Sequence, residues 1–342
     1  MTSHRTFPFT GFPAAFAVAL VACGDTYSDE PAIAAGDPAT AAVTDNLDEE
    51  PHPPPPCPPC QSAEGRPPLG DFNGDGISDI LWRNSQTGEM RVWVMDTRYP
   101  TLCAGEVVLA PPTPDPGWKI KGTGDFDGDG DTDILWQNDT SHRVVIWIMR
   151  DTTHIAGGYV DCGPEWLGDF RIAGTGHYNE DSKADILWQH VSDPRELWVW
   201  YMDGLTCKGD VGPMPDGKPE GNWNSSGGGY FDDGTHGLLT GSDVLWRNSD
   251  SGRVVIWYMD GFERTGGVFT VPDGSAFHNS REIVGIGRWA TDDYCSDVLW
   301  RSNDTGSLSV WTMTGNIATS LVPVQGCGTT ATEANWAVVG PH

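Results

Sequence analysis

Positive charge is scarce in this chain. Its 342 residues include 20 Lys and Arg residues against 48 Asp and Glu residues, which gives a formal net charge of −28 at pH 7. Such a charge repels the phosphates of nucleic acids and the anionic headgroups of lipids. It therefore argues strongly against a nucleic-acid partner, and it favours cations where acidic residues gather in loops.

Short motifs that mark common enzyme active sites are also missing. The sequence contains no nucleophile elbow, no HExxH pair and no phosphate-binding glycine loop, and its nine histidines lack metal-site spacing. We therefore predict that the protein is not an enzyme.

The amino terminus has the features of a targeting segment. Arg5 precedes the apolar stretch Phe7–Ala22, which is too short to cross a bilayer stably. We predict that residues 1–22 form a cleaved signal peptide. The segment Leu20–Cys23 resembles the bacterial lipobox, in which the cysteine becomes the lipidated first residue of the mature protein.

This resemblance implies that Cys23 carries a lipid anchor. Gly24 rather than Asp follows the cysteine, which favours the outer membrane as the destination. The alternative is ordinary signal-peptidase cleavage near Ala22, which would leave a freely secreted protein.

Residues 24–66 are predicted to form a disordered tether. They join the acidic stretch Asp45–Glu50 to the proline-rich stretch Pro51–Cys60 and show no apolar periodicity. Such a segment cannot bury enough surface to fold, and its prolines favour a stiff, extended spacer. Because Cys57 and Cys60 lie among these prolines, their CxxC spacing favours a local or intermolecular disulfide over a redox site.

A repeat extends over the rest of the chain. The motif Asp-Ile/Val-Leu-Trp occurs five times, about every 54 residues, and a Trp-x-Met motif follows each copy. Polar turn residues between the two motifs, flanked by alternating β-branched and aromatic residues, predict a β-hairpin in each repeat. The motif tryptophans are Trp82, Trp136, Trp188, Trp246 and Trp300.

Two further strands complete each repeat, as in Trp118–Gly122 before an aspartate loop and Gly105–Leu109 after a Trp-x-Met motif. Four strands in about 54 residues is the size of a propeller blade. We predict an all-β, five-bladed β-propeller over residues 67–342. The first repeat lacks its leading strand, and Trp336–Gly340 matches the missing one, so this carboxyl-terminal strand should close the ring. A solenoid would gain nothing from such a strand.

Two of the loops have the composition of calcium-binding loops. Asp71–Asp79 offers side-chain oxygens at positions 1, 3, 5 and 9 and a backbone carbonyl at position 7, and Asp125–Asp133 does the same with more charge. A tight turn that merely favours Asp and Gly is the alternative, but carboxylates this close would repel one another without a cation. The predicted ligands are Asp71, Asn73, Asp75, Ile77 and Asp79, and Asp125, Asp127, Asp129, Asp131 and Asp133.

The sequence from Gly70 to Trp82 resembles the FG-GAP or VCBS-type repeat of integrin α-subunit propellers and of many bacterial surface proteins. The resemblance covers residues 69–340. It implies that the two loops bind calcium on one face of the propeller. An EF-hand would instead need Glu at position 12 and a following helix, whereas a strand tryptophan occupies that position.

The other three loops depart from this pattern. In His177–Asp185 a histidine takes the first position, both glycines are missing and Lys183 lies inside the loop. Tyr230–Asp243 has no regular ligand spacing, and Arg288–Asp297 has Arg, Trp and Tyr where acids belong, so we predict no ion in either. A third calcium site, with weaker support, would use Asn179, Asp181 and Asp185.

The remaining tryptophans and cysteines allow fewer assignments. Trp198 and Trp289 fall outside the register of the repeat and could be exposed for stacking on a sugar or a partner. Without Cys23, an odd number of cysteines remains, so they cannot all pair within the chain. A Cys295–Cys327 disulfide is one conceivable pair, and the sequence does not assign the connectivity.

Together these features predict a non-enzymatic, calcium-stabilised binding or adhesion module on a lipid-anchored tether, with an unknown protein or glycan as ligand. Two alternatives stay open. One is a calcium-dependent lectin that binds glycans in pockets between blades, and the other is a passive structural protein of the envelope. The departing loops, from Tyr230 to Asp297, are where we expect a ligand first.

Overall fold

The structure is a computed structural model that describes residues 66–110, 116–160, 162, 167–179, 181–193, 196–214, 221–232, 241–290, 294–327 and 335–341. All of them belong to the compact unit Asp48–His342. The predicted signal peptide, the lipidation site Cys23 and residues 24–65 of the predicted tether lie outside the described residues. No helix within the described ranges has the length and apolar composition needed to cross a membrane.

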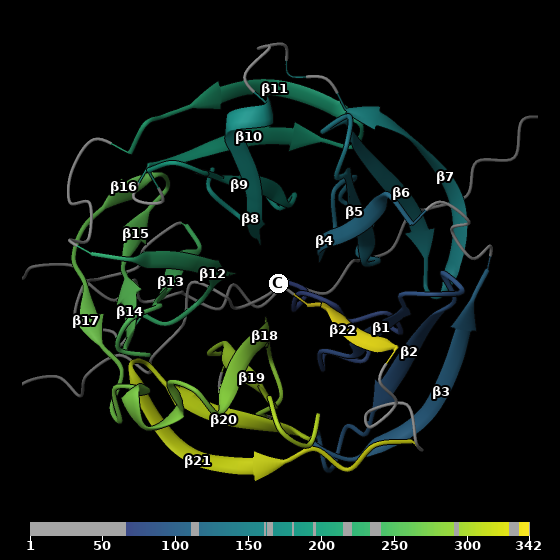
Figure 1. Cartoon of the computed structure of the whole chain (residues 1–342). Helices are drawn as coiled ribbons and strands as arrows, with labels where there is room; N and C mark the ends of the chain where they lie inside the picture. Colours follow the sequence, from purple (N-terminus) through teal and green to yellow (C-terminus); the bar gives the residue numbers. More distant parts are fainter. Residues whose placement is uncertain are drawn as a thin grey trace, which may run out of the picture. The chain divides into compact units, whose positions relative to one another are not determined.

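Five four-stranded antiparallel sheets form a ring, one for each repeat, as Figure 1 shows. From the axis outwards, blade 1 contains β22 (Trp336–Gly340), β1 (Ile80–Asn84), β2 (Met90–Met95) and β3 (Cys103–Leu109). Blade 2 contains β4 (Trp118–Gly124), β5 (Asp133–Asn138), β6 (Val144–Arg150) and β7 (Thr153–Val160). Blade 3 contains β8 (Phe170–Gly176), β9 (Asp185–His190), β10 (Leu197–Asp203) and β11 (Thr206–Val211).

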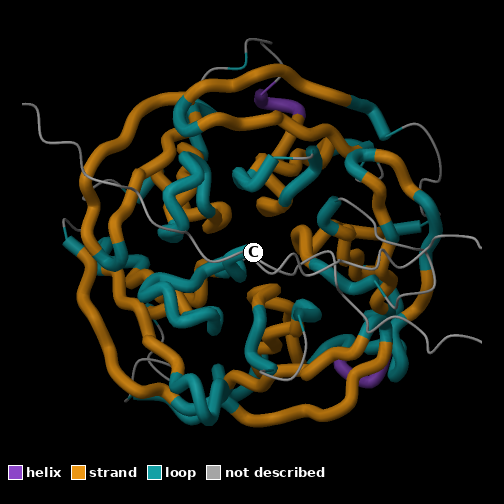
Figure 2. The backbone as a smooth tube through the Cα atoms, turned by 180° about the vertical axis from the view of Figure 1, so that it is seen from behind, coloured by secondary structure: helices purple, strands orange, loops and turns teal. Residues whose placement is uncertain are grey.

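Blades 4 and 5 follow the same order. Blade 4 contains β12 (Trp223–Gly229), β13 (Asp243–Asn248), β14 (Val254–Trp257) and β17 (Val268–Phe269), with a small hairpin of β15 (Met259–Asp260) and β16 (Glu263–Arg264). Blade 5 contains β18 (Arg281–Gly287), β19 (Asp297–Ser302), β20 (Leu308–Thr314) and β21 (Ile317–Pro323). Seen from behind, in Figure 2, the first strand of each blade again lies nearest the axis.

The predicted closure of the ring is confirmed. Strand β22 pairs antiparallel with β1, with Val338 opposite Trp82, and so supplies the inner strand that the first repeat lacks. The predicted leading strand Trp118–Gly122 lies within β4. In blade 3 the leading strand β8 begins at Phe170, which takes the place of Trp118.

Two disulfides join neighbouring blades near their outer strands. Cys103 of β3 is bonded to Cys327, which follows β21, and the Cys103 N–H also donates to the carbonyl of Gln325 at 2.8 Å. Cys162 is bonded to Cys207 in β11. The conceivable Cys295–Cys327 pair is therefore wrong, because Cys327 reaches across the closure of the ring to blade 1. No cysteine within the described ranges is free.

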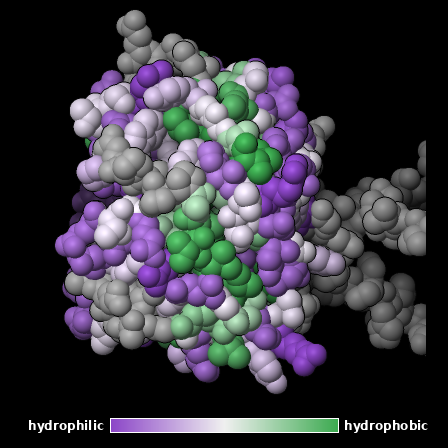
Figure 3. All heavy atoms as spheres, turned by 90° about the vertical axis from the view of Figure 1, so that its right-hand side faces the viewer, coloured by the Kyte–Doolittle hydropathy of each residue, from purple (hydrophilic) through white to green (hydrophobic). Residues whose placement is uncertain are grey.

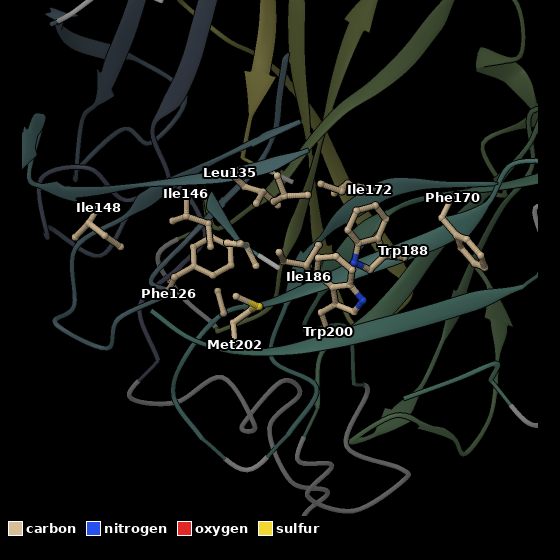
Figure 4. Packing of buried hydrophobic residues seen from close by; sticks show 13 residues of the cluster. Phe126, Leu135, Ile146, Ile148, Phe170, Ile172, Ile186, Trp188, Trp200 and Met202 are labelled. Carbon is tan, nitrogen blue, oxygen red and sulfur yellow. The ribbon is translucent and has the colours of Figure 1, made fainter. Parts of the chain in front are cut away.

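The core consists of five clusters of apolar side chains, each lying between two adjacent blades. Figure 4 shows the cluster between blades 2 and 3, where Phe126 and Ile146 face Ile186 and Trp200. In every blade the two motif tryptophans also contact each other, with ring centroids between 4.6 Å and 5.0 Å apart. Such a pair contributes about 1 kcal/mol beyond its buried area.

Burial decreases from the second strand of a blade to the rim. Every residue of β5 is buried because adjacent blades cover both of its faces, whereas β7 alternates between exposed and half-buried residues. Figure 3 views the flank that faces right in Figure 1, where hydrophobic residues lie among hydrophilic ones. Among the exposed large hydrophobic residues of the outer strands are Val108, Ile155 and Tyr159.

The expected exposure of Trp289 is wrong. Its side chain is 2% exposed and packs in the cluster between blades 5 and 1. Arg288 and Trp289 take the places of Asp71 and Phe72, so Trp289 is the buried second residue of its loop. Trp198 is half-buried, donates from Nε1 to Glu196 at 3.0 Å and contacts Phe170 edge-on.

Candidate metal centre in the aspartate loops

In blades 2 to 5 the aspartate loop connects the inner strand to the second strand, and in blade 1 the loop precedes the second strand, β1, so all five loops lie at the same end of the axis. The aromatic second residue of every loop is buried, which fixes the start of the loop against the blade. These residues are Phe72, Phe126, Tyr178, Phe231 and Trp289.

The last aspartate of each loop holds two parts of the blade together. In the first loop, Asp79 accepts the N–H of Phe72 on Oδ2 and the N–H of Met95 on Oδ1, both at 2.9 Å. The methionine of the Trp-x-Met motif supplies the second donor, which explains why the two motifs occur together. The equivalent bonds are made by Asp133, Asp185, Asp243 and Asp297.

This arrangement occurs in all five loops, including the two for which no ion is predicted. An aspartate at the ninth position is therefore explained by backbone contacts alone and does not by itself indicate calcium. Burial raises the pKa of Asp79 to about 7, that of Asp133 to about 8 and that of Asp185 to about 7, against the opposing effect of the N–H donors.

The first aspartate of each intact loop accepts hydrogen bonds from backbone N–H groups later in the same loop. Asp125 accepts the N–H of Gly128 on Oδ1 at 2.7 Å and the N–H of Gly130 on Oδ2 at 2.9 Å. Both glycines have positive φ, 82° and 95°, a backbone conformation that residues other than glycine rarely adopt. Asp71 is held in a similar way by Gly76, whose N–H donates to its Oδ2 at 2.7 Å.

The loop of blade 2 gathers its carboxylates closely enough for one ion. Asp125, Asp127 and Asp133 each offer an oxygen, and these three atoms lie within 4.8 Å of one another. No other part of the described chain brings three acidic, histidine or cysteine side chains together in this way. Burial raises the pKa of Asp125, and burial together with the charge of Asp129 raises that of Asp127. The donor set therefore fits a hard cation, which would lower these pKa values.

The loop of blade 1 has the same turn with a different pairing. The Asn73 side-chain amide donates to Oδ2 of Asp75 at 2.8 Å, and Asp75 in turn accepts the N–H of Ile77 at 3.0 Å. The acids of this loop are therefore fewer and partly engaged by an amide. The predicted ligands Asp129 and Asp131 of blade 2 both lie on the loop, where the Asp131 N–H donates to Asp129 at 3.0 Å.

Two positively charged side chains from loops that depart from the calcium-loop pattern lie against the calcium-type loops of blades 1 and 2. The sequence did not indicate these contacts. Arg288 of blade 5 donates to the carbonyl of Gly76 in blade 1, from Nε at 3.0 Å and from Nη2 at 2.7 Å. Lys183 of blade 3 lies against Gly128 of blade 2 and forms an ion pair with Asp203. The residues that replace acids in these loops therefore support the neighbouring acidic loops.

The third predicted site is built differently. His177, at its first position, is buried and hydrogen-bonds through Nδ1 to the hydroxyl of Tyr230 at 2.8 Å. Burial, together with the charge of Arg66, lowers the pKa of His177 to about 3. Asn179 donates to Asp181 at 3.1 Å, and Asp185 makes its two backbone bonds.

A belt of hydrogen bonds connects the loops around the whole ring. The residue before the last aspartate of each loop contacts the carbonyl of the first residue of the preceding loop. The backbone bonds are Ser78 to Arg288 at 3.0 Å, Ala184 to Asp125 at 2.7 Å, Ser242 to His177 at 2.6 Å and Ser296 to Tyr230 at 2.8 Å. In blade 2 the Thr132 hydroxyl donates to the Asp71 carbonyl at 2.8 Å.

A small cavity lies at the loop end of the region in which we expected a ligand first. It lies among the loops and is lined by His177, Tyr230, Arg288 and Tyr294, with a volume of about 20 Å³. That volume suits a water molecule rather than a ligand.

No family model matches the chain, and no curated protein matches it. A chain in the crystal structure of a nidogen/laminin complex is 11% identical, with a TM-score of 0.35, and the match covers 71% of this chain and 92% of that chain. The Dos1 propeller is 9% identical, with a TM-score of 0.29, and the match covers 80% of this chain and 90% of that chain.

The sheet order of the chain itself defines its fold. Five sheets of four strands surround one axis, and the last strand completes the first sheet. The FG-GAP or VCBS-type character of the loops stays a prediction from their sequence. The chain is a five-bladed β-propeller.

Proposed function

We propose that this protein is a non-enzymatic binding module whose propeller is stiffened by calcium at the loops of blades 1 and 2. The observation that carries the proposal is the group of carboxylates in blade 2, where Asp125, Asp127 and Asp133 offer oxygens within 4.8 Å of one another. The first and last of these acids are already held by backbone N–H groups. An ion bound there would brace the loop rather than act on a substrate.

The belt of hydrogen bonds gives calcium a consequence beyond one loop. Because the Asp125 carbonyl accepts the N–H of Ala184 in blade 3, an ordered second loop also fixes the end of the third loop. Ligands that bind only the folded state stabilise it, by about 2.7 kcal/mol at a concentration 100 times Kd. Calcium should therefore raise the unfolding temperature of the whole propeller.

The test is thermal unfolding of the full chain in calcium and in excess EDTA. Wild type should unfold at a higher temperature in calcium. The variants Asp127→Asn and Asp75→Asn should each lose part of that increase, and the double variant should lose all of it. Asp304→Asn removes the same charge from an exposed turn of blade 5 and should keep the full increase. An identical melting temperature in calcium and in EDTA would refute the calcium proposal.

We also propose that the protein is exported and anchored through Cys23 in the outer membrane, with secretion as the alternative. The disulfides Cys103–Cys327 and Cys162–Cys207 support an oxidising compartment. Labelling of cells with a fatty-acid analogue should mark wild type and leave Cys23→Ala unlabelled in the soluble fraction. Equal labelling of both proteins would contradict the anchor.

A further inference from the structure

A cavity of about 400 Å³ lies on the axis of the propeller, away from the aspartate loops. Residues from all five inner strands line it, and they come from the first part of each strand, whereas the loops follow the strand ends. The volume falls within the range of small-molecule sites, about 300–1,000 Å³. Its polar and charged lining residues are Lys121, Arg171, Ser225, Ser226, Glu282 and Arg301.

The inner strands carry β-bulges at this depth. The pairing of β4 with β5 shifts between Ile120 and Gly122, so Lys121 is the extra residue of its bulge. Bulges redirect a side chain out of the regular ladder. Ala173, Ser226 and Val284 occupy the same position in blades 3, 4 and 5. A lysine at this position is therefore a feature of blade 2 and not of the repeat.

Positive charge exceeds negative charge in the wall of this very acidic molecule. Glu282 is the one acid among the lining residues, and it lies directly opposite Arg301 in the ladder of β18 and β19. Arg301 also donates to the Trp336 carbonyl of blade 1 at 3.1 Å, so a contact between blades explains the position of Arg301. Arg247 of blade 4 makes the equivalent bond to the Arg281 carbonyl of blade 5, at 2.7 Å. Among the residues that the structure describes, neither Lys121 nor Arg171 forms an ion pair with Glu282 or with another acid.

Lys121 and Arg171 lie on adjacent blades, and burial together with the charge of Arg171 lowers the pKa of Lys121. Among the described residues, no hydrogen bond or ion pair holds the Lys121 ammonium. Burial lowers the pKa of Lys121; the charge of Asp139 opposes this effect, and those of Arg171 and Lys119 add to it. Arg171 is held through Nη2, which donates to Gln189 and to Asn224. Its other nitrogens donate to no described residue, and a guanidinium can bind a carboxylate with two parallel bonds.

The opposite part of the wall offers hydroxyl groups. The Ser225 hydroxyl oxygen accepts the N–H of Gly227 at 3.3 Å, which leaves its hydrogen to donate. Within the described residues, the Ser226 hydroxyl has no hydrogen-bond partner. With Glu282 as a further acceptor, this part of the wall suits a ligand that carries several hydroxyl groups.

We propose that the axial cavity binds a small polyhydroxylated carboxylate, the chemistry of an acidic sugar. Its carboxylate lies between Lys121 and Arg171, and its hydroxyl groups face Ser225, Ser226 and Glu282. The inference deepens the proposed binding function, on which it rests, by naming a site and a ligand class. It does not depend on calcium, because the cavity and the aspartate loops lie at different depths along the axis.

The test is isothermal titration calorimetry of the full chain with a panel of hexuronic acids, the matched neutral hexoses and inorganic phosphate. At least one hexuronic acid should bind, its neutral hexose should bind at least about tenfold more weakly, and added salt should reduce the affinity. Lys121→Met keeps the apolar stem and should weaken uronate binding about tenfold. Lys119→Met, two residues earlier on the same strand, should leave the affinity unchanged, because Lys119 pairs with Asp139 outside the cavity wall.

Several results would overturn the site. They are the absence of binding by every hexuronic acid, equal binding of the neutral hexoses, tight binding of phosphate alone, or equal losses in the two lysine variants. Arg171→Lys offers a second variant that keeps the charge but loses the paired donors, and it should weaken uronate more than phosphate. The calcium-dependent melting temperature of the same samples separates the two proposals, because either can fail while the other holds.

Discussion

At the scale of single residues, one side chain can have two tasks that the sequence does not separate. The last aspartate of each loop occupies the position of a calcium ligand in the sequence pattern. In all five loops, however, it accepts backbone N–H groups from the start of the loop and from the Trp-x-Met motif. The first position varies much more, from Asp71 to His177 and Arg288. Calcium binding should therefore depend on the early acids of a loop, whereas the stability of the fold should depend on the last aspartate.

Asp297→Ala tests this separation in a loop without predicted ligands. Asp297 accepts N–H bonds from Trp289, Ala290 and Met313, at 2.6 Å to 2.8 Å. Losing a charged, buried acceptor should lower the free energy of unfolding by about 3 kcal/mol. Denaturant unfolding should give the same loss in calcium and in EDTA. A loss that disappears in EDTA would mean that this aspartate acts through an ion.

His177 should make the protein sensitive to acid. Its folded pKa of about 3 lies below the unfolded value near 6.5, so the unfolded chain binds the proton first as the pH falls. The stability it contributes is present above pH 6.5 and is lost progressively on acidification. The free energy of unfolding should fall by about 2–3 kcal/mol more in wild type than in His177→Gln between pH 7.5 and pH 4.5.

The difference between these two proteins is the quantity to measure. Asp79, Asp133 and Asp185 have raised pKa values and act in the opposite direction, since the folded state takes up their protons first as the pH falls. Their effect is common to wild type and variant and cancels in the comparison. Parallel pH profiles for the two proteins would show that His177 is not the responsible group.

At the scale of strands and loops, the glycine that precedes each aspartate loop has no Cβ, and this lets neighbouring blades pack closely against each other at that point. A Cβ added at Gly124 would lie 2.6 Å from the Cβ of Ala184, and neither atom can move without its backbone. Gly124→Ala should therefore lower the free energy of unfolding by about 1–3 kcal/mol. Gly105→Ala in the outer strand β3 meets nothing within 4 Å and serves as the matched control. Equal unfolding midpoints for the two variants would contradict this account.

How much the sequence predicts also depends on the element. Strands, blades and the closing strand follow from a motif repeated five times, because each copy supports the reading of the others. The fifth loop is hard to align from sequence because it has one residue more than the intact loops and lacks their acids, which hides the correspondence of Trp289 with Phe72. The order Gly287-Arg288-Trp289, compared with Gly70-Asp71-Phe72, is the signal that identifies its place.

Other features exist only once the ring is assembled. The contact of Arg288 with Gly76 joins residues 212 positions apart, and the partner of Cys327 lies in the first blade. The axial cavity draws its wall from five strands that are remote from one another in sequence. No local pattern encodes such contacts, because they depend on the curvature of the whole ring.

At the scale of the molecule, the two described disulfides should differ in their effect. Cys103–Cys327 spans 224 residues and Cys162–Cys207 spans 45. If a disulfide acts mainly by restricting the unfolded chain, the longer loop should contribute about 1 kcal/mol more. Double serine variants of each pair, compared by denaturant unfolding, provide the measurement. A larger loss from the shorter loop would exclude this explanation.

The placement of β22 also affects the order in which the protein can be made. Blade 1 combines β1 with a strand that follows all the other described strands in the sequence, so the inner edge of β1 has no partner until that strand has been synthesised. Contacts of such large sequence separation form slowly, and an unpaired edge can associate with other chains in the meantime. The nascent protein should therefore need protection of its first blade longer than of any later one, until synthesis reaches Trp336–Gly340.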